Sequence, residues 1–192
     1  MMGGAMTQRG VLIAIVGPSG VGKDSLLGGA QENLPNVHFL QRTITRPADA
    51  GGESHQAVSE DEFRALRERQ TFLFHWQAHG LFYGIPMDAK TLVRNGHTVV
   101  FNGSRHALAD QRELWPELKI IWVTADPELR AERLAARGRE EGADIRNRLA
   151  IADAEIPADA ALVENNATLE EGIRRMTDAI SRLDRECRAA AI

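Results

Sequence analysis

The sequence has a single cysteine, Cys187, among its 192 residues. One cysteine excludes an intrachain disulfide, and a chain of this length with 43% hydrophobic residues can bury a sufficient core without one. The first residues also lack the basic and apolar stretches of a secretory signal. These absences favour a reducing compartment, and we expect a cytoplasmic location.

Long apolar runs and an excess of positive charge are missing as well. The longest apolar run, Val11–Val16, is far shorter than the roughly 20 residues that a membrane-spanning helix needs. The 23 basic and 27 acidic residues give a net charge of −4, which disfavours a broad nucleic-acid surface. We therefore expect no membrane or nucleic acid as partner and predict a small phosphorylated compound. The oligomeric state stays open, a homodimer included.

Hydrophobic strands alternate with helical patterns along the chain. Val11–Val16 indicates a buried strand, and Asp24–Asn33 indicates the helix that follows it. Two more helices have clear boundary residues: Ser59 with Glu62 as a capping box, and Asp126, Pro127 and the closing Gly138. Other strands are expected at 98–101, 119–124 and 160–163, and other helices at 87–94, 105–114 and 169–188. This alternation predicts an α/β fold with a mostly parallel central sheet flanked by helices, in one domain from residue 11 to 188 after a flexible leader of residues 1–10.

The segment Gly17-Pro-Ser-Gly-Val-Gly-Lys23 lies between the first strand and the first helix. Its spacing is that of a Walker A loop, in which glycines let backbone N–H groups approach phosphate oxygens and the lysine reaches the β and γ phosphates. A glycine-rich turn with an exposed lysine is the alternative. We predict a P-loop fold that binds ATP as co-substrate, with Lys23 as a catalytic cation. The predicted nucleotide-binding residues are Gly17, Pro18, Ser19, Gly20, Val21, Gly22, Lys23, Asp24 and Ser25.

One position departs from the Walker A pattern. Asp24 stands where a serine or threonine hydroxyl normally binds magnesium, and the next hydroxyl belongs to Ser25. The Asp24 carboxylate is a hard oxygen donor that can bind Mg²⁺; the alternative is an acid that only stabilises the helix N-terminus. We predict Mg²⁺ as cofactor, with Asp24 and Ser25 as candidate ligands.

The region after the first helix resembles the acceptor region of guanylate kinases. The residues that carry the resemblance are Thr43-Ile-Thr-Arg-Pro47, Gly52-Glu53, His55-Gln-Ala-Val-Ser59 and Tyr83-Gly84. The resemblance implies that Arg46 and Tyr83 hold the acceptor phosphate. However, Asp49 stands at the position of the second acceptor arginine, and Phe74 at that of the guanine-reading glutamate. Because phenylalanine accepts no hydrogen bond from guanine, we expect an acceptor that is not a nucleotide.

A narrower resemblance is to the ribose 1,5-bisphosphate phosphokinases. It is carried by Gly-Pro-Ser-Gly-x-Gly-Lys-Asp-Ser at 17–25, Thr-Arg-Pro at 45–47, His-Gly-Leu-Phe-Tyr-Gly at 79–84 and Asn-Gly-Ser-Arg at 102–105. It implies ATP-dependent phosphorylation of ribose 1,5-bisphosphate to 5-phospho-α-D-ribose 1-diphosphate and ADP, in phosphonate degradation. The implied substrate-binding residues are Arg42, Arg46, His55, Tyr83 and Arg105. For Arg42 a solvated strand-end charge is the alternative, and for His55 an ordinary polar role.

The same resemblance divides the domain into functional parts. It implies an acceptor-binding subregion at about 40–86 and a short lid at about 137–148, which carries Arg137-Gly-Arg139, Arg146 and Arg148. Arg137 and Arg148 are the predicted catalytic arginines of the lid, and solvated helix faces paired with nearby acids are the alternative. No general base is needed, because the acceptor phosphate is already ionised.

Two asparagines follow predicted strands. Asn102 stands where related kinases carry an acidic residue, so a carboxylate relocated to Asp24 is one interpretation and an ordinary turn the other. Asn165 matches a region where related kinases contact adenine, but Asn165-Asn166 is equally typical of a simple turn. Two other functions remain open: a divergent guanylate or other nucleoside monophosphate kinase, and a non-catalytic guanylate-kinase-like binding module, against which the intact loop argues.

Overall fold

The computed structural model describes residues 10–48, 53–136 and 155–190. The chain divides into two compact units. The first comprises Met1–Ile13, Asn36–Phe101 and Ser181–Ile192, and the second comprises Ala14–Pro35 and Asn102–Ile180. The single domain and its leader stay predictions. None of the helices among the described residues is long and apolar enough to cross a membrane.

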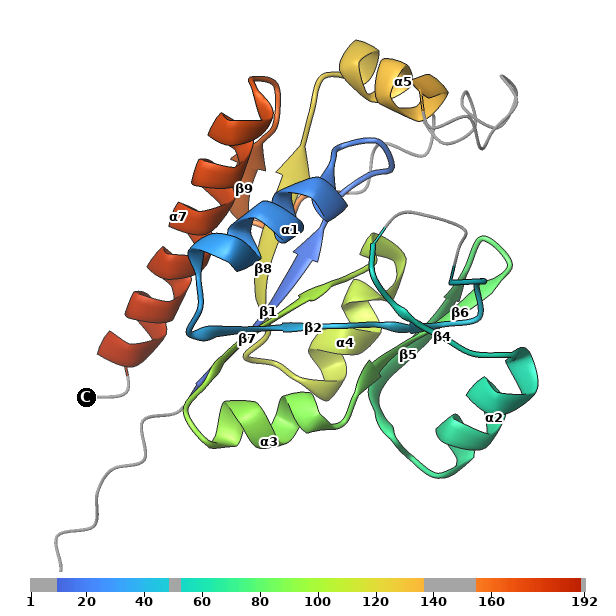
Figure 1. Cartoon of the computed structure of the whole chain (residues 1–192). Coiled ribbons are helices and arrows are strands. Elements are labelled where there is room, and N and C mark those ends of the chain that lie inside the picture. The colour runs from blue at the N-terminus through green and yellow to red at the C-terminus, as the bar shows by residue number, and fades with distance from the viewer. Residues whose placement is uncertain (1–9, 49–52, 137–154, 191–192) are drawn as a thin grey trace, which may run out of the picture. The chain divides into compact units, whose positions relative to one another are not determined.

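Figure 1 shows the strands and helices of the described residues. The strands are β1 (Val11–Val16), β2 (Val37–Leu40), β3 (Thr43–Ile44), β4 (Gln56–Ala57), β5 (Phe72–Ala78), β6 (Leu81–Pro86), β7 (Thr98–Asn102), β8 (Lys119–Thr124) and β9 (Ala161–Glu164). The helices are α1 (Lys23–Asn33), α2 (Glu60–Glu68), α3 (Asp88–Arg94), the 3₁₀ turn η1 (Arg105–Ala107), α4 (Leu108–Leu114), α5 (Pro127–Ala136) and α7 (Leu169–Ala189).

A five-stranded sheet has the order β2-β7-β1-β8-β9. In the first unit β2 pairs with β7 in parallel, and in the second unit β8 pairs with β9 in parallel. Every residue of β1 is buried, which explains its uninterrupted apolar sequence, since strands covered on both faces need no polar alternation. The predicted α/β fold with a parallel central sheet is confirmed.

The first unit also contains a four-stranded sheet, β4-β3-β6-β5. The strands β5 and β6 form an antiparallel hairpin at one edge of this sheet, and β3 pairs with β6 so that Ile44 lies opposite Tyr83. Phe63 of α2 stacks on Phe72 and Phe82, with ring centroids 4.8 and 5.6 Å apart. None of these four strands was predicted; β3 and β4 have only two residues each and show no periodicity.

Helix boundaries follow the predicted capping residues closely. Ser59 Oγ accepts a hydrogen bond from Glu62 N at 3.2 Å, and the Glu62 carboxylate accepts one from Ser59 N at 2.7 Å. The capping box is therefore confirmed. The helical stretch predicted near 105–114 is confirmed; it begins as the 3₁₀ turn η1 and continues as α4. Pro127 begins α5 as predicted, whereas Gly138 lies outside the described residues.

Candidate active site

The Walker A segment forms a loop in the second unit between the end of β1 and the start of α1 (Figure 1). Gly17 has a φ of 151°, and a Cβ there would lie 2.3 Å from the carbonyl oxygen of Val123. Gly22, directly before α1, has a left-handed φ of 88°. A side chain at Gly17 would collide with backbone, and one at Gly22 would be strained, so this loop path requires glycine at both positions.

Lys23 is the first residue of α1 and turns back over the loop. Its Nζ donates hydrogen bonds to the carbonyl oxygens of Gly17 at 2.8 Å and Pro18 at 3.0 Å. The ammonium group is therefore held beside the loop from which its own helix starts. This position suits an interaction with phosphate oxygens above the loop, which remains a prediction.

Two other carbonyl groups of the loop accept hydrogen bonds from side chains that lie far along the sequence. Arg130 Nε of α5 donates to Ser19 O at 3.1 Å, and Asn165 Nδ2, directly after β9, donates to Val21 O at 2.7 Å. In a trans peptide the N–H of the following residue points away from the C=O. Holding these carbonyls therefore directs the next two amides to the other side of the loop, where an anion can bind them.

Asp24 and Asn102 form a direct contact beside the loop. Asn102 Nδ2 donates to Asp24 Oδ1 at 2.9 Å, and Asn102 is only 4% exposed at the end of β7. Asp24 is half-buried in the first turn of α1, whereas Ser25 is exposed. Of the two candidate magnesium ligands, Asp24 is thus the one that a neighbouring side chain orients.

Two arginines bring positive charge to the second unit. Burial lowers the pKa of Arg105, and the nearby charge of Arg130 lowers it further. Arg130 itself is 3% exposed. Because two neighbouring guanidinium groups repel each other and both attract anions, this part of the second unit suits a phosphate group. Arg105 was predicted as a substrate residue; Arg130 was not, although its spacing to Arg133 places both on one face of α5.

In the first unit, His55 links two parts of the predicted acceptor region. His55 Nδ1 lies 3.0 Å from Glu53 O, and His55 Nε2 lies 3.1 Å from Arg46 O. Arg46 Nη2 lies 3.3 Å from His55 Nδ1. Within the described ranges, the buried Nε of Arg46 has no hydrogen-bond partner. Arg46 and His55 therefore contact each other, and the Nε of Arg46 is available as a hydrogen-bond donor.

Arg42 and Tyr83 belong to a second cluster of the same unit. The Arg42 guanidinium forms an ion pair with Glu53 and lies 5.0 Å from the centroid of the Tyr83 ring. The Tyr83 ring in turn stacks on Trp76, with centroids 5.4 Å apart and an angle of 5° between the planes. The contacts of Arg42 therefore fix the Tyr83 ring. Glu53 was quoted only within a motif, and nothing in the sequence pattern singled out Trp76.

Comparisons with known proteins give the family to which this chain belongs. A protein-family model described as an AAA domain matches residues 13–153. The ribose 1,5-bisphosphate phosphokinase PhnN of Ruegeria sp. (strain TM1040) is 48% identical over 149 residues, 78% of each chain. The protein of the same name from Rhizobium etli (strain CIAT 652) is 43% identical over 178 residues, 90% of each chain. The chain belongs to the ribose 1,5-bisphosphate phosphokinase family. It is therefore a kinase.

Solved structures share the fold of this family member. A guanylate kinase from Anaplasma phagocytophilum superposes with a TM-score of 0.68 at 19% identity, covering 95% of this chain and 90% of that one. A gluconokinase from Sinorhizobium meliloti 1021 gives 0.54 at 17% identity, covering 93% and 96%. At these identities the likeness shows the fold alone.

Phe74, which the resemblance to guanylate kinases puts at the position of the guanine-reading glutamate, lies in β5 of the first unit. Its side chain is 2% exposed in β5, and its ring packs against Phe101 with centroids 5.7 Å apart. The residue is thus part of the core of the first unit. It offers neither a hydrogen-bonding group nor an accessible surface to a base.

Some predicted residues lie outside the described part of the chain, among them Arg137, Arg148 and Asp49.

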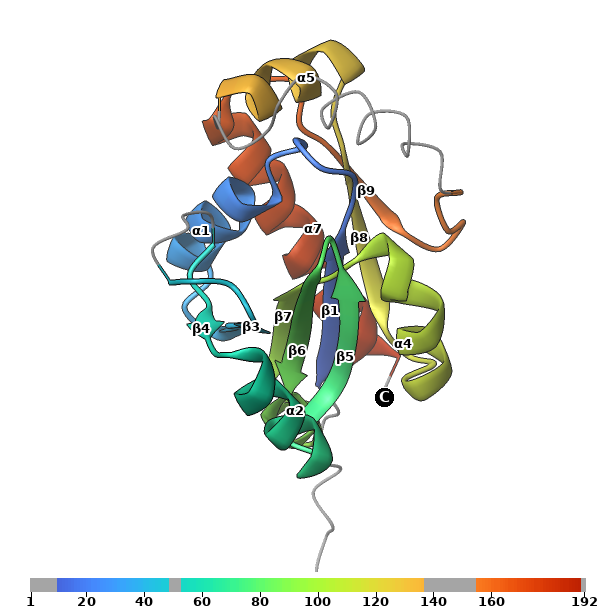
Figure 2. The same ribbon diagram turned by 90° about the vertical axis from the view of Figure 1, so that its right-hand side faces the viewer.

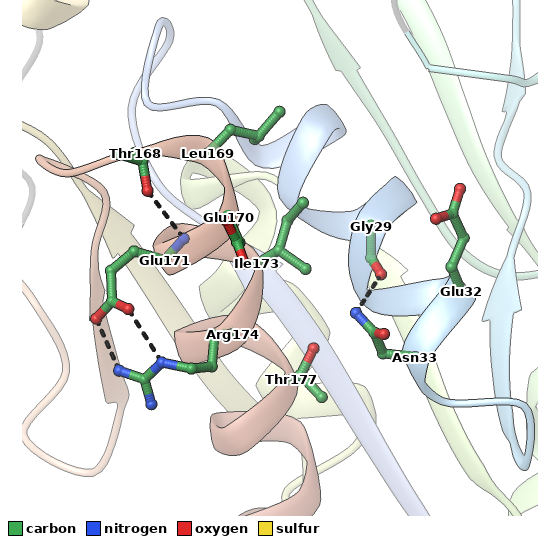
Figure 3. A pocket seen from close by; sticks show the side chains of 10 residues that line it. All are labelled: Gly29, Glu32, Asn33, Thr168, Leu169, Glu170, Glu171, Ile173, Arg174 and Thr177. Atoms are coloured by element: carbon green, nitrogen blue, oxygen red, sulfur yellow. Dashed lines mark hydrogen bonds and ion pairs between the residues drawn. The ribbon is translucent and has the colours of Figure 1, made fainter.

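The described residues also line an open groove of about 880 Å³ between α1 and the start of α7, shown in Figure 3. Its walls include Glu32, Ile173 and the ion pair of Glu171 with Arg174. Because no predicted site residue lines this groove, it is not assigned to phosphoryl transfer.

Proposed function

We propose that this chain transfers the γ-phosphoryl group of ATP to the 1-phosphate of ribose 1,5-bisphosphate. The products are 5-phospho-α-D-ribose 1-diphosphate and ADP, and phosphonate degradation is the proposed pathway. The observation that carries the proposal is the intact phosphate loop, with Lys23 turned over it, in a chain of this family. A cytoplasmic location, where ATP is available, is part of the proposal.

The reaction consists of one displacement at phosphorus. An oxygen of the 1-phosphate forms a bond to the γ-phosphorus while the bond to the β–γ bridging oxygen breaks, and ADP leaves with the electron pair. The attacking oxygen is already ionised, so no proton has to be removed. The protein's task is to align two highly charged groups and offset their repulsion. Cationic side chains and backbone amides are the groups suited to that task.

In our proposal the second unit holds the donor. The loop amides bind the β-phosphate, and Lys23 binds the β and γ phosphates. Arg105, which the resemblance implies as a substrate-binding residue, supplies charge where the transferring group meets the acceptor phosphate. The predicted lid arginines, Arg137 and Arg148, complete the charge compensation. Arg130 keeps the loop in shape through Ser19 O, 3.1 Å from its Nε.

The residues beside the loop fit a nucleotide-bound magnesium ion. Mg²⁺ in kinases is held by one or two protein oxygens together with substrate phosphates and waters. Within the described ranges no cluster of three or more His, Cys, Asp or Glu side chains could hold a metal on its own. The Asp24 carboxylate supplies one hard oxygen donor, and Ser25 is the second candidate. When bound with ATP, the ion neutralises charge on the β and γ phosphates.

The acceptor belongs to the first unit in this proposal. Arg46 presents a buried Nε donor, His55 fixes the backbone around it, and the hydroxyl of Tyr83 donates to the same phosphate. For Arg42 we propose a role other than the substrate contact that the resemblance implies. Since its guanidinium is paired with Glu53 and lies over the Tyr83 ring, we assign it to positioning that ring.

The test uses purified protein with ATP and magnesium, offered ribose 1,5-bisphosphate or GMP separately, with products identified by phosphorus NMR. We expect a new diphosphate signal with the sugar and none with GMP. Lys23→Ala should lower the rate at least about 100-fold, while Lys90→Ala on α3 should not. Turnover of GMP alone would make the chain a guanylate kinase. No turnover with either acceptor would favour a binding module.

A further inference from the structure

The contact between Asp24 and Asn102 joins the two positions that usually hold magnesium in P-loop enzymes. Asp24 follows the loop lysine, and Asn102 ends β7, the strand next to β1 in the sheet order. In the ordinary arrangement the first position is a serine or threonine hydroxyl and the second is an aspartate at a strand end. This chain therefore has a carboxylate and a neutral oxygen-bearing group at the same two positions, with their places reversed.

Because Asn102 is buried and hydrogen-bonded to Asp24, the charge of each residue affects the other. Asn102 is 4% exposed, and its Nδ2 lies 2.9 Å from Asp24 Oδ1. A second carboxylate at this distance from the first would be repelled strongly in a buried site. A hydroxyl at position 24 beside the neutral Asn102 would leave the pair without charge. The carboxylate of Asp24 is thus compatible with the neutral amide of Asn102. A carboxylate at position 102 alone, or a hydroxyl at position 24 alone, would change the charge of the pair.

We propose that Asp24 is the carboxylate ligand of the nucleotide-bound divalent cation and that Asn102 is its positioning residue. The Asn102 amide holds Oδ1, so that Oδ2 is the oxygen presented to the ion. Asn102 does not itself need to touch the metal. The inference rests on the proposed use of a metal–nucleotide donor, but it does not depend on the identity of the acceptor.

Four proteins test the proposal by varying the number and position of carboxylates at the pair. They are the unchanged chain, Asp24→Thr, Asn102→Asp and the double variant Asp24→Thr/Asn102→Asp, with 1, 0, 2 and 1 carboxylates at the pair, respectively. The measured quantity is the affinity for Mn²⁺ in the presence of saturating ADP, followed by electron paramagnetic resonance. Affinity for metal-free ADP is measured in parallel by calorimetry. Thermal melting of each variant confirms that it is folded.

Asp24→Thr should weaken Mn²⁺ binding at least tenfold, while metal-free ADP binding stays the same or improves because a negative charge is gone. The double variant should return Mn²⁺ affinity to within about threefold of the original, since it restores one carboxylate in the ordinary arrangement. Asn102→Asp alone should melt at a lower temperature without metal and recover when Mn²⁺ and ADP are added, because the ion separates two adjacent charges.

Two outcomes would refute the proposed reversed arrangement. One is an Asp24→Thr protein with unchanged Mn²⁺ affinity, and the other is a double variant whose Mn²⁺ affinity is no higher than that of Asp24→Thr. Ser25→Ala is the matched control, and a tenfold loss there without one in Asp24→Thr would assign the ligand to the hydroxyl. Because no sugar phosphate enters these measurements, a wrong acceptor would appear only in the turnover assay. Absence of any Mn²⁺–ADP binding by the unchanged chain would refute both proposals.

Discussion

Asn165 has two candidate roles, support of the phosphate loop and contact with adenine, and a single variant can distinguish them. It is 3% exposed, and its Nδ2 donates to Val21 O of the phosphate loop at 2.7 Å. The sequence suggested an adenine contact instead. In Asn165→Ala a buried loop carbonyl loses its donor, which costs about 1–3 kcal/mol. Because the ligand must then order the loop, we expect binding to weaken by about 5- to 140-fold, at 1.4 kcal/mol for each factor of ten.

Inorganic triphosphate distinguishes the two functions, because it occupies a phosphate loop but has no base. Calorimetry with Mg²⁺ should show the same loss for ATP and for triphosphate if Asn165 braces the loop. Asn166→Ala is the matched control, since Asn166 is exposed and bonds to Asp126 rather than to the loop. A loss confined to ATP would refute the bracing role and support the adenine contact. Equal affinities of Asn165→Ala and the unchanged protein would refute both.

The remaining predictions concern the first unit. Gly84→Ala would put a Cβ 2.5 Å from the Phe72 ring, so we expect a loss of about 1–3 kcal/mol in the free energy of unfolding, measured with urea. Ser59→Ala removes the helix cap and should cost about 1 kcal/mol. The hydrogen bonds from Ser59 lower the pKa of Glu62, so its contribution is present above its unfolded pKa and is lost as pH falls through the lower folded value. Glu62→Gln should therefore flatten the stability profile in acid, and an unchanged profile would contradict this assignment.

The central fold could be predicted because its elements carry strong local patterns. The buried β1 is one uninterrupted apolar run, and the capping box of Ser59 and Glu62 specifies where α2 begins. The phosphate loop follows from glycine spacing between a strand and a helix. In contrast, β3 and β4 are formed by pairing between short segments, which no local periodicity reveals.

The supporting contacts of the site could not be predicted, because they join residues far apart in the sequence. Arg130 and Ser19 are separated by 111 positions, and Asn165 and Val21 by 144. A motif shows that the loop exists but does not show which side chains hold its carbonyls. Similarly, the sequence suggested that Asp24 compensates for Asn102, but only the structure shows that the two side chains are hydrogen-bonded.

Helix α5 connects two parts of the proposed mechanism. Arg130 attaches it to the phosphate loop, and its last residue, Ala136, directly precedes the predicted lid arginines. If nucleotide binding at the loop favours lid closure, closure must favour nucleotide binding by the same free energy. An acceptor that promotes lid closure would then raise the affinity for ATP. The enzyme would retain its donor most firmly when the correct acceptor is present, and water would have less opportunity to take the phosphoryl group.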